Sequence, residues 1–246
     1  MRVHLQPAFV LHSRHYRDSS LLLEVLTAEY GRISLVAKGA RRSVRGRSSG
    51  AILQPFTPLL LSFSGKSEMK TLVGSEVAGE VPALRGERLY SGIYLNELLM
   101  RLMHRNDAHP GLFIAYGDAV ASLGDSGALG DILRRFEFNL LDELGYGFDL
   151  RADGYNGEDV QSGRWYYYHQ EFGLVEQRAK AAPGIPVFSG ADMLAVAAGE
   201  RSDAARLAAK RLLRYALAGH LGDQPLKSRE LFRRPPSSTV TQEKSE

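Results

Sequence analysis

Cationic side chains are concentrated in one segment of the chain that has no acidic residues. Residues 30–67 contain no aspartate or glutamate, and their cations are Arg32, Lys38, Arg41, Arg42, Arg45, Arg47 and Lys66. Guanidinium and ammonium groups at this density can neutralise the phosphates of a nucleic acid. Gly39 and Gly46 interrupt regular structure here, so we expect a loop that folds its cations around a phosphate backbone. The alternative is a solvated loop that only keeps the protein soluble.

Motifs for covalent chemistry are weaker. Residues 46–50 match the G-x-S-x-G pattern of serine hydrolases, but that chemistry needs Ser48 on a turn between a strand and a helix, and a β-like run follows. Residues 65–67 resemble the end of a phosphate-cradling loop, but Leu60 stands where its first glycine is required. We predict that the chain is not an enzyme, and we keep a hydrolase acting through Ser48 as the rival interpretation.

The sequence predicts no metal site and no cofactor. It contains no cysteine, which excludes disulfides, thiolate zinc sites and cysteine nucleophiles. The seven histidines form no i, i+4 pair with a nearby glutamate. No pair of carboxylates stands out for general acid and base catalysis.

Charge is divided unevenly along the chain. Residues 1–79 carry 11 Lys and Arg against 5 Asp and Glu, so their net charge is +6, whereas residues 80–246 carry 20 against 23, a net charge of −3. This asymmetry predicts two parts with different roles. The first residues lack the apolar core of a secretory leader, and no run approaches the roughly 18 apolar residues of a membrane span. We therefore expect a cytosolic protein with no membrane partner.

The first part, residues 1–79, is predicted to form a small closed or nearly closed β-barrel. Apolar runs between polar or glycine turns indicate strands at 8–13, 20–27, 32–38, 53–63 and 69–78, with a hairpin turn at 29–31. Pro55 and Pro58 then require strand ends or bends. Five aromatic residues are candidates for base stacking, although most aromatics of a small barrel belong to its core: Phe9, Tyr16, Tyr30, Phe56 and Phe63.

The second part, residues 80–234, is predicted to be a helical domain. Leucines at helical spacing mark apolar faces over residues 95–102, 129–144 and 207–217, with Gly145 ending the second helix and Ser202 or Asp203 capping the third. Residues 149–178 form an insert whose hairpin turns near 171–173, and its aromatic run 165–168 is either a recognition strip or packing. Residues 235–246 are predicted to be a flexible tail.

Two further basic clusters lie in the helical part. Arg134 and Arg135, beside Leu141 and Leu144, could bind an acidic peptide that carries hydrophobic anchors, although an ordinary amphipathic helix explains the pattern more simply. Lys227 and Arg229 belong to a second basic patch, which is another strand contact or a short capping helix.

Several segments resemble the RecO family of bacterial recombination mediators. They are residues 8–14, 31–41 (G-R-I-S-L-V-A-K-G-A-R), 53–61, 89–99, 134–137, 144–147 and 225–233. The resemblance implies an α+β protein, with an N-terminal oligonucleotide-binding fold (OB-fold) barrel followed by a C-terminal helical domain. Many relatives carry four zinc-ligating cysteines in the insert, and this chain has none. Zinc is therefore not expected, and we expect the hairpin to be held by packing of Trp165 and the tyrosines at 166–168.

The same resemblance implies a function in DNA repair and recombination without catalytic residues. Members bind single- and double-stranded DNA, anneal complementary strands, and cooperate with RecR and with the C-terminal tail of single-strand binding protein to load RecA in the RecF pathway. Such a protein would be cytoplasmic and associated with the nucleoid. The tail is acidic and ends in hydrophobic residues, so the resemblance favours a peptide site at Arg134, Leu141 and Leu144. An RNA-binding or ribosome-associated barrel factor remains the alternative, because contacts to the 2′-hydroxyl are not readable from sequence.

Overall fold

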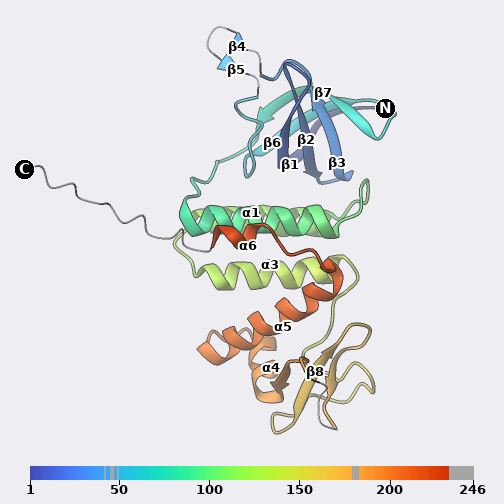
Figure 1. Cartoon of the computed structure of the whole chain (residues 1–246), viewed down its shortest axis with the longest axis vertical. Helices are drawn as coiled ribbons and strands as arrows, with labels where there is room; N and C mark the ends of the chain where they lie inside the picture. Colours follow the sequence, from blue (N-terminus) through green and yellow to red (C-terminus); the bar gives the residue numbers. More distant parts are fainter. Residues whose placement is uncertain (42, 45–46, 49, 179–182, 233–246) are drawn as a thin grey trace, which may run out of the picture.

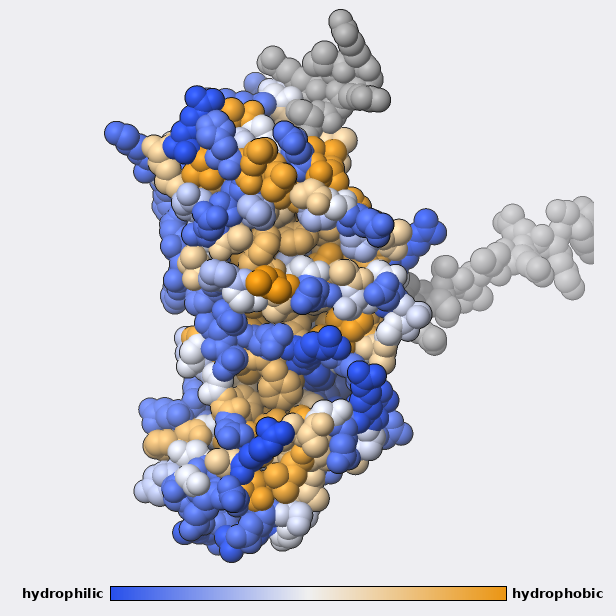
Figure 2. Space-filling view, turned by 180° about the vertical axis from the view of Figure 1, so that it is seen from behind, coloured by the Kyte–Doolittle hydropathy of each residue, from blue (hydrophilic) through white to orange (hydrophobic). Residues whose placement is uncertain are grey.

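The structure is a computed structural model that describes residues 1–41, 43–44, 47–48, 50–178 and 183–232. A β-barrel occupies one end of the long axis, helices follow, and a small sheet lies at the other end (Figure 1). Seen from behind, the surface is a mixture of hydrophilic and hydrophobic residues (Figure 2). The predicted α+β class, with an N-terminal OB-fold barrel and a helical C-terminal part carrying a small β insert, is confirmed. The predicted tail at 235–246 lies outside the described residues.

The barrel is built from β1 (Arg2–Tyr16), β2 (Ser20–Thr27), β3 (Gly31–Ala37), β6 (Pro58–Ser64) and β7 (Met69–Val77). The strands close in the order β1-β2-β3-β7-β6, and every pairing is antiparallel except that of β3 with β7. Five strands in this Greek-key order are the arrangement of an OB-fold. Two short strands, β4 (Ser43–Val44) and β5 (Arg47–Ser48), form a hairpin inside the basic segment.

Alternation along the strands fills the barrel. Leu23 faces Leu35 and Val25 faces Ile33 across the β2–β3 pair, and all four side chains are buried. The predicted hairpin turn between these strands is confirmed, since Gly31 has φ +61°. Pro58 is the first residue of β6, where a missing amide hydrogen is tolerated. This agrees with the expectation that the proline lies at a strand end.

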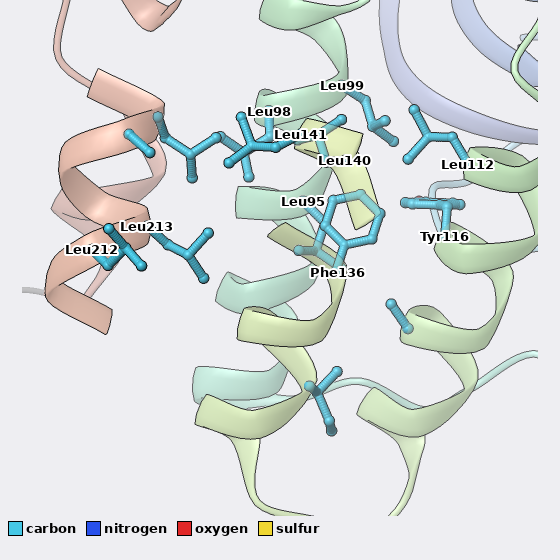
Figure 3. Close-up of a cluster of buried hydrophobic side chains, with 14 of the residues drawn as sticks. Leu95, Leu98, Leu99, Leu112, Tyr116, Phe136, Leu140, Leu141, Leu212 and Leu213 are labelled. Carbon is cyan, nitrogen blue, oxygen red and sulfur yellow. The ribbon is translucent and has the colours of Figure 1, made fainter. Parts of the chain in front are cut away.

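The helical part comprises α1 (Gly86–Leu102), α2 (Pro110–Gly124), α3 (Leu129–Glu143), α4 (Gly190–Ala197), α5 (Asp203–Leu221) and α6 (Ser228–Leu231). Leucines of α1, α3 and α5 meet with Leu112 and Tyr116 of α2 in one core (Figure 3). Gly145 follows α3 with φ +79°, and Ser202 Oγ accepts a hydrogen bond from the Ala205 amide, so both predicted helix boundaries are confirmed. The sequence did not predict α2 or α4. No described helix is both long and apolar enough to cross a membrane.

The insert, residues 149–178, contributes β8 (Trp165–His169) and β9 (Gly173–Glu176) to a three-stranded sheet, which β10 (Val187–Ser189) completes in the order β10-β8-β9; we call it the insert sheet. The β8–β9 hairpin confirms the predicted turn, and β10 was not predicted. Tyr166 and Tyr168 are buried as expected. The expectation for Trp165 is wrong, because its side chain is 57% exposed.

A buried carboxylate organises the insert in the absence of cysteine ligands. Asp153 is 4% exposed, and its side chain accepts hydrogen bonds from the amides of Tyr155 at 2.8 Å, Asn156 at 3.3 Å and Glu176 at 2.7 Å. These bonds join the loop that precedes β8 to the strand that follows it. A buried charge satisfied by several amides can therefore fix this region without a metal.

The connection between α1 and α2, residues 103–107, is docked on the barrel, and we call it the clasp. The Asn106 amide donates to the Arg32 carbonyl at 3.0 Å, and Lys70 Nζ reaches Asn106 Oδ1 at 3.4 Å. A Cβ atom on Gly31 would lie 1.8 Å from the Asp107 carbonyl oxygen, so only glycine allows this approach. The clasp fixes the barrel to the helices at the Gly31 end of β3.

Candidate nucleic-acid interface

Three exposed cations gather at the end of the barrel that points away from the helices. Lys38 directly follows β3, and Arg17 lies in the turn between β1 and β2. Arg41 is held beside that turn, because its amide donates to the Ser19 carbonyl at 3.0 Å and its guanidinium to the Asp18 carbonyl at 3.1 Å. We call Arg17, Lys38 and Arg41 the basic rim. Sequence reasoning missed Arg17, which lies outside the acid-free segment.

A hollow of ≈ 400 Å³ opens at the basic rim, with Tyr16, Ser19 and Thr71 in its lining. It exists because β3 and β7 pair at only three positions, the last of which joins Val36 to Thr71, and the strands separate beyond it. The Arg17 guanidinium lies 5.3 Å from the centre of the Tyr16 ring. Cations, hydroxyls and an aromatic ring in one open hollow are the groups that contact phosphate, sugar and base of a single strand.

The charges of the basic rim are not neutralised by the described part of the protein. Asp18 is the carboxylate of the same turn, but only its backbone carbonyl contacts Arg41. Within the described ranges, Arg17, Lys38 and Arg41 form no ion pair with any carboxylate. The rim therefore offers three cations against one carboxylate to an incoming anion.

The remaining arginines of the basic segment can be placed only in part. Arg42 and Arg45 lie outside the described residues, and Arg47 is placed by its backbone, which pairs with Val44 in the β4–β5 hairpin. That hairpin projects from the barrel at the end opposite the helices (Figure 1). The segment therefore continues from the basic rim away from the body of the protein.

Arg32 differs from the other predicted phosphate ligands. Its side chain is 12% exposed, points toward the clasp, and donates to Glu24 Oε2 at 3.3 Å and to the Met103 carbonyl at 3.0 Å. Arg105 shares Glu24 at 2.7 Å. Burial lowers the pKa of Arg32, although the Glu24 carboxylate opposes that shift. Arg32 therefore belongs to a buried ion cluster, and we leave it out of the interface.

Lys66, Lys227 and Arg229 are exposed but lie apart from the basic rim. Lys66 is in the β6–β7 turn beside Met1, at the opposite end of the β3–β7 pair from Lys38. Lys227 and Arg229 flank the start of α6, which packs on α1 in the helical part. A short helix, one of the two alternatives that the sequence left open, is present here, and a DNA contact by its cations stays a prediction.

Glu97 of α1 holds the start of α6 in place. It accepts hydrogen bonds from the Lys227 amide at 2.8 Å, the Ser228 amide at 2.9 Å and the Ser228 hydroxyl at 2.6 Å. Burial raises the pKa of Glu97, but these hydrogen bonds outweigh it, so the net pKa is lowered.

Most of the candidate stacking residues are core. Phe9, Phe56 and Phe63 are at most 8% exposed, and Tyr30 packs edge-on against Phe63 with ring centres 5.6 Å apart. Only Tyr16 lines the hollow at the basic rim. One aromatic of the five therefore faces a surface that bases could reach.

A second basic hollow, of ≈ 310 Å³, lies between α3 and α5, and we call it the basic groove. Phe138, Val196 and Ala209 contribute apolar surface. The lining also holds four arginines and two carboxylates: Arg134, Arg135, Arg201 and Arg206, with Asp131 and Glu200. Two other residues predicted for a peptide site lie elsewhere. Leu141 is 1% exposed inside the helical core (Figure 3), and Leu144 packs against the same core at the end of α3.

The arginines of the basic groove differ in how far they are neutralised. Arg134 is bonded to Glu137, a buried carboxylate that also accepts from the Tyr94 hydroxyl at 2.7 Å. Arg206 donates twice to Asp131 at 3.0 Å, and these bonds lower the pKa of that carboxyl. Arg201 is 73% exposed, and its ion pair with Asp131 is longer, at 3.8 Å. Arg135 is exposed and makes no ion pair in the described part of the chain.

In the described part of the chain, the G-x-S-x-G pattern at residues 46–50 does not lie on the strand–turn–helix that a serine hydrolase needs. Ser48 lies in the two-residue strand β5, and the next helix along the described chain is α1, which begins at Gly86. A nucleophile elbow needs a helix directly after the serine. Over the described residues, no cluster of three or more His, Asp or Glu side chains has the arrangement of a metal site.

Comparison with known proteins covers almost the entire chain. Residues 1–80 match the family model described as "Recombination protein O N terminal", and residues 84–230 match "Recombination protein O C terminal". The DNA repair protein RecO of Nitrosococcus oceani is 49% identical over 233 residues, which are 94% of each chain. Proteins of the same name are 45% identical in Azoarcus sp. over 94% of this chain and 96% of the relative, and 47% identical in Shigella flexneri over 96% of each.

Proposed function

The chain belongs to the recombination protein O family of DNA repair proteins, and from that premise we propose that it is a DNA-binding recombination mediator that makes and breaks no covalent bond. Membership of the family assigns it to DNA repair and recombination. The observation that carries the proposed DNA contact is the basic rim on an OB-fold barrel: Arg17 and Lys38 line an open hollow, Arg41 lies beside them, and none of the three is in an ion pair within the described ranges.

The basic rim suits strand annealing by charge neutralisation. Two single strands repel each other through their phosphates, and cations between them release counterions and lower that repulsion. Arg17, Lys38 and Arg41 supply the described part of this charge, and the arginines at 42, 45 and 47 extend it in sequence. Strands held in this way can pair through their bases, while a duplex contacts the same cations through its backbone alone. We propose that such a complex, together with RecR, helps to load RecA at the nucleoid.

Salt dependence tests the electrostatic part of this proposal. If the basic rim and its neighbouring arginines contact about five phosphates, log affinity for an oligodeoxynucleotide falls with log salt with a slope of roughly −3.5. Fluorescence anisotropy of a labelled single strand between about 50 and 300 mM salt measures this slope. A slope near zero contradicts phosphate binding. Competition with RNA of equal sequence tests the alternative of an RNA-binding factor. That alternative requires a higher affinity for the RNA than for the DNA.

The basic groove is the proposed site for the tail of single-strand binding protein. Such a tail is acidic and ends in hydrophobic residues, and the groove combines the exposed cations Arg135 and Arg201 with the apolar surface of Phe138 and Val196. Charge-assisted hydrogen bonds to carboxylates and burial of an anchor side chain are the two contacts that this ligand requires. Arg134 contributes less to peptide binding than the sequence predicted, because its guanidinium already donates hydrogen bonds to Glu137.

Charge reversal in the basic groove tests this site. Arg135→Glu with Arg201→Glu is expected to weaken an acidic peptide with a hydrophobic C-terminus about tenfold or more, because each change replaces an attraction by a repulsion. Anisotropy of the labelled peptide measures the change, and affinity for naked DNA is measured on the same variant. Peptide binding that survives both substitutions, or a parallel loss of DNA affinity, contradicts a separate peptide site.

A further inference from the structure

A third hollow, of ≈ 350 Å³, lies where the insert sheet meets α5, and neither the barrel nor the basic groove accounts for it. Residues of the insert sheet and of the end of α5 line it, among them Tyr167, Tyr168, His169, Tyr215, Ala218 and Gly219. Tyr168 is buried and its ring meets Tyr215 edge-on at 6.3 Å, whereas Tyr167, His169 and Tyr215 are partly exposed. The hollow therefore presents aromatic surface to solvent.

Two exposed cations of α5 are neighbours, by helical spacing, of residues that line this aromatic hollow. Arg211 is one helical turn before Tyr215, and Arg214 is one turn before Ala218, so both lie on the helix face that lines the hollow. Arg211 is also placed over the insert sheet, with its guanidinium 5.5 Å from the Phe188 ring. Both side chains are exposed, and in the described ranges neither forms an ion pair.

Two carboxylates lie on the neighbouring elements. Glu171 is in the β8–β9 turn, where its amide bonds to His169 Nδ1, and Asp192 is in the first turn of α4. Neither is in an ion pair with Arg211 or Arg214. The positive charge at the border of the hollow therefore stays available to a ligand.

We propose that the aromatic hollow is a second contact for single-stranded nucleic acid. An unstacked base lies against the partly exposed ring of Tyr167 or Tyr215, and the adjoining phosphates lie on Arg211 and Arg214. Aromatic faces and cations in alternation are the recognised means of holding a single strand without reading its sequence. This inference rests on the proposed function for one point, that the ligand is a nucleic acid. The residues of the proposed contact are separate from those of the basic rim.

The aromatic hollow is selective for single strands. The bases of a duplex are stacked on each other and present only their edges, so they cannot offer a face to Tyr167 or Tyr215. A base in a single strand exposes its face at little cost. The basic rim, in contrast, contacts phosphates that single and double strands share.

Photocrosslinking separates the two contacts. A single strand containing 5-iodouracil is irradiated with the full-length protein, and crosslinked peptides are mapped by mass spectrometry. We expect crosslinks to Tyr167 or Tyr215 in addition to the barrel, and a loss of about tenfold in those crosslinks for Arg211→Gln with Arg214→Gln. Arg2→Gln with Arg85→Gln removes the same charge from two exposed arginines of the barrel and the start of α1, and is the matched control. Crosslinks confined to the barrel overturn the aromatic hollow but not the basic rim.

The single tryptophan gives a second readout. Trp165 is two residues from Tyr167 on the same face of β8 and is 57% exposed, so its fluorescence reports on ligands at this face. In a variant with Lys38→Glu and Arg41→Glu, quenching by a single strand is expected to persist, and it is expected to disappear when Arg211 and Arg214 are also replaced. Absence of quenching in the wild type overturns the aromatic hollow, whereas absence of any crosslink to the barrel contradicts the proposed function.

Discussion

Replacing Lys38 and Arg41 by glutamate is expected to lower the affinity for single-stranded DNA about 100-fold at ~0.1 M salt. Loss of two phosphate contacts accounts for about 25-fold at this salt, and the two carboxylates add repulsion. The salt slope is expected to become shallower by about 1.4, since each lost contact removes about 0.7. Strand annealing is expected to slow in parallel, because both strands lose the cations that screen them. Anisotropy titrations across salt and a fluorescence annealing assay measure the two effects.

The control for this variant carries the same charge change at other sites. Arg2 lies at the opposite end of β1 and Arg85 precedes α1, and both are exposed. Arg2→Glu with Arg85→Glu is expected to change DNA affinity less than about threefold, because only long-range attraction is altered. Equal losses in the two double variants would show that net charge, rather than the basic rim, governs binding.

Glu24→Ala is expected to destabilise the protein by about 3 kcal/mol, the second large effect. Glu24 is 9% exposed and bonds to Arg32, to Arg105 and to the Ser34 hydroxyl at 2.7 Å. Its removal leaves the guanidinium of Arg32 unpaired in a buried position, which costs more than the ion pair itself contributes. Chemical denaturation followed by circular dichroism measures the loss of unfolding free energy.

Two companion variants define the origin of that loss. Glu76 is exposed on β7 of the same barrel, and Glu76→Ala is expected to change stability by less than about 0.5 kcal/mol. Adding Arg32→Met to Glu24→Ala is expected to restore about 1 kcal/mol or more, because it removes the stranded charge. If Glu24→Ala is no more harmful than Glu76→Ala, the buried ion cluster does not stabilise the fold.

The barrel could be predicted from sequence because its signals are local. Alternating apolar runs, the glycine hairpin at Gly31 and the position of Pro58 each act within a few residues, and all three reappear in the structure. The helix α2 was missed because apolar residues surround most of its circumference, which removes the periodic contrast that marks an amphipathic helix. The strand β10 was missed because three residues are too few to show alternation.

Counting charges along the chain could not identify the partners of Arg32. The absence of acids over residues 30–67 is a statement about sequence, and Glu24 lies on the neighbouring strand β2, paired with Ser34. Arg105 joins the same cluster from far along the chain. Strand register and the docking of the clasp decide this burial, and neither is encoded within the basic segment.

The sequence did contain a signal for Arg17 that was not used. In an antiparallel meander the turn between the first two strands lies at the same end as the exit of the third, so the β1–β2 turn had to adjoin Lys38. The basic groove held no comparable signal. Arg201 and Arg206 reach Arg135 only because α5 packs against α3, a contact between segments that are distant in sequence.

The clasp also constrains how a partner can hold both ends of the molecule. Asn106, Arg105 and the close approach of Asp107 to Gly31 hold the barrel against the helices, so the clasp helps to set the span from the basic rim to the basic groove. A protein that coats the bound strand and also inserts its own tail must bridge that span with its linker. Bivalent capture therefore has a minimum tether length, and below it the gain in avidity vanishes completely.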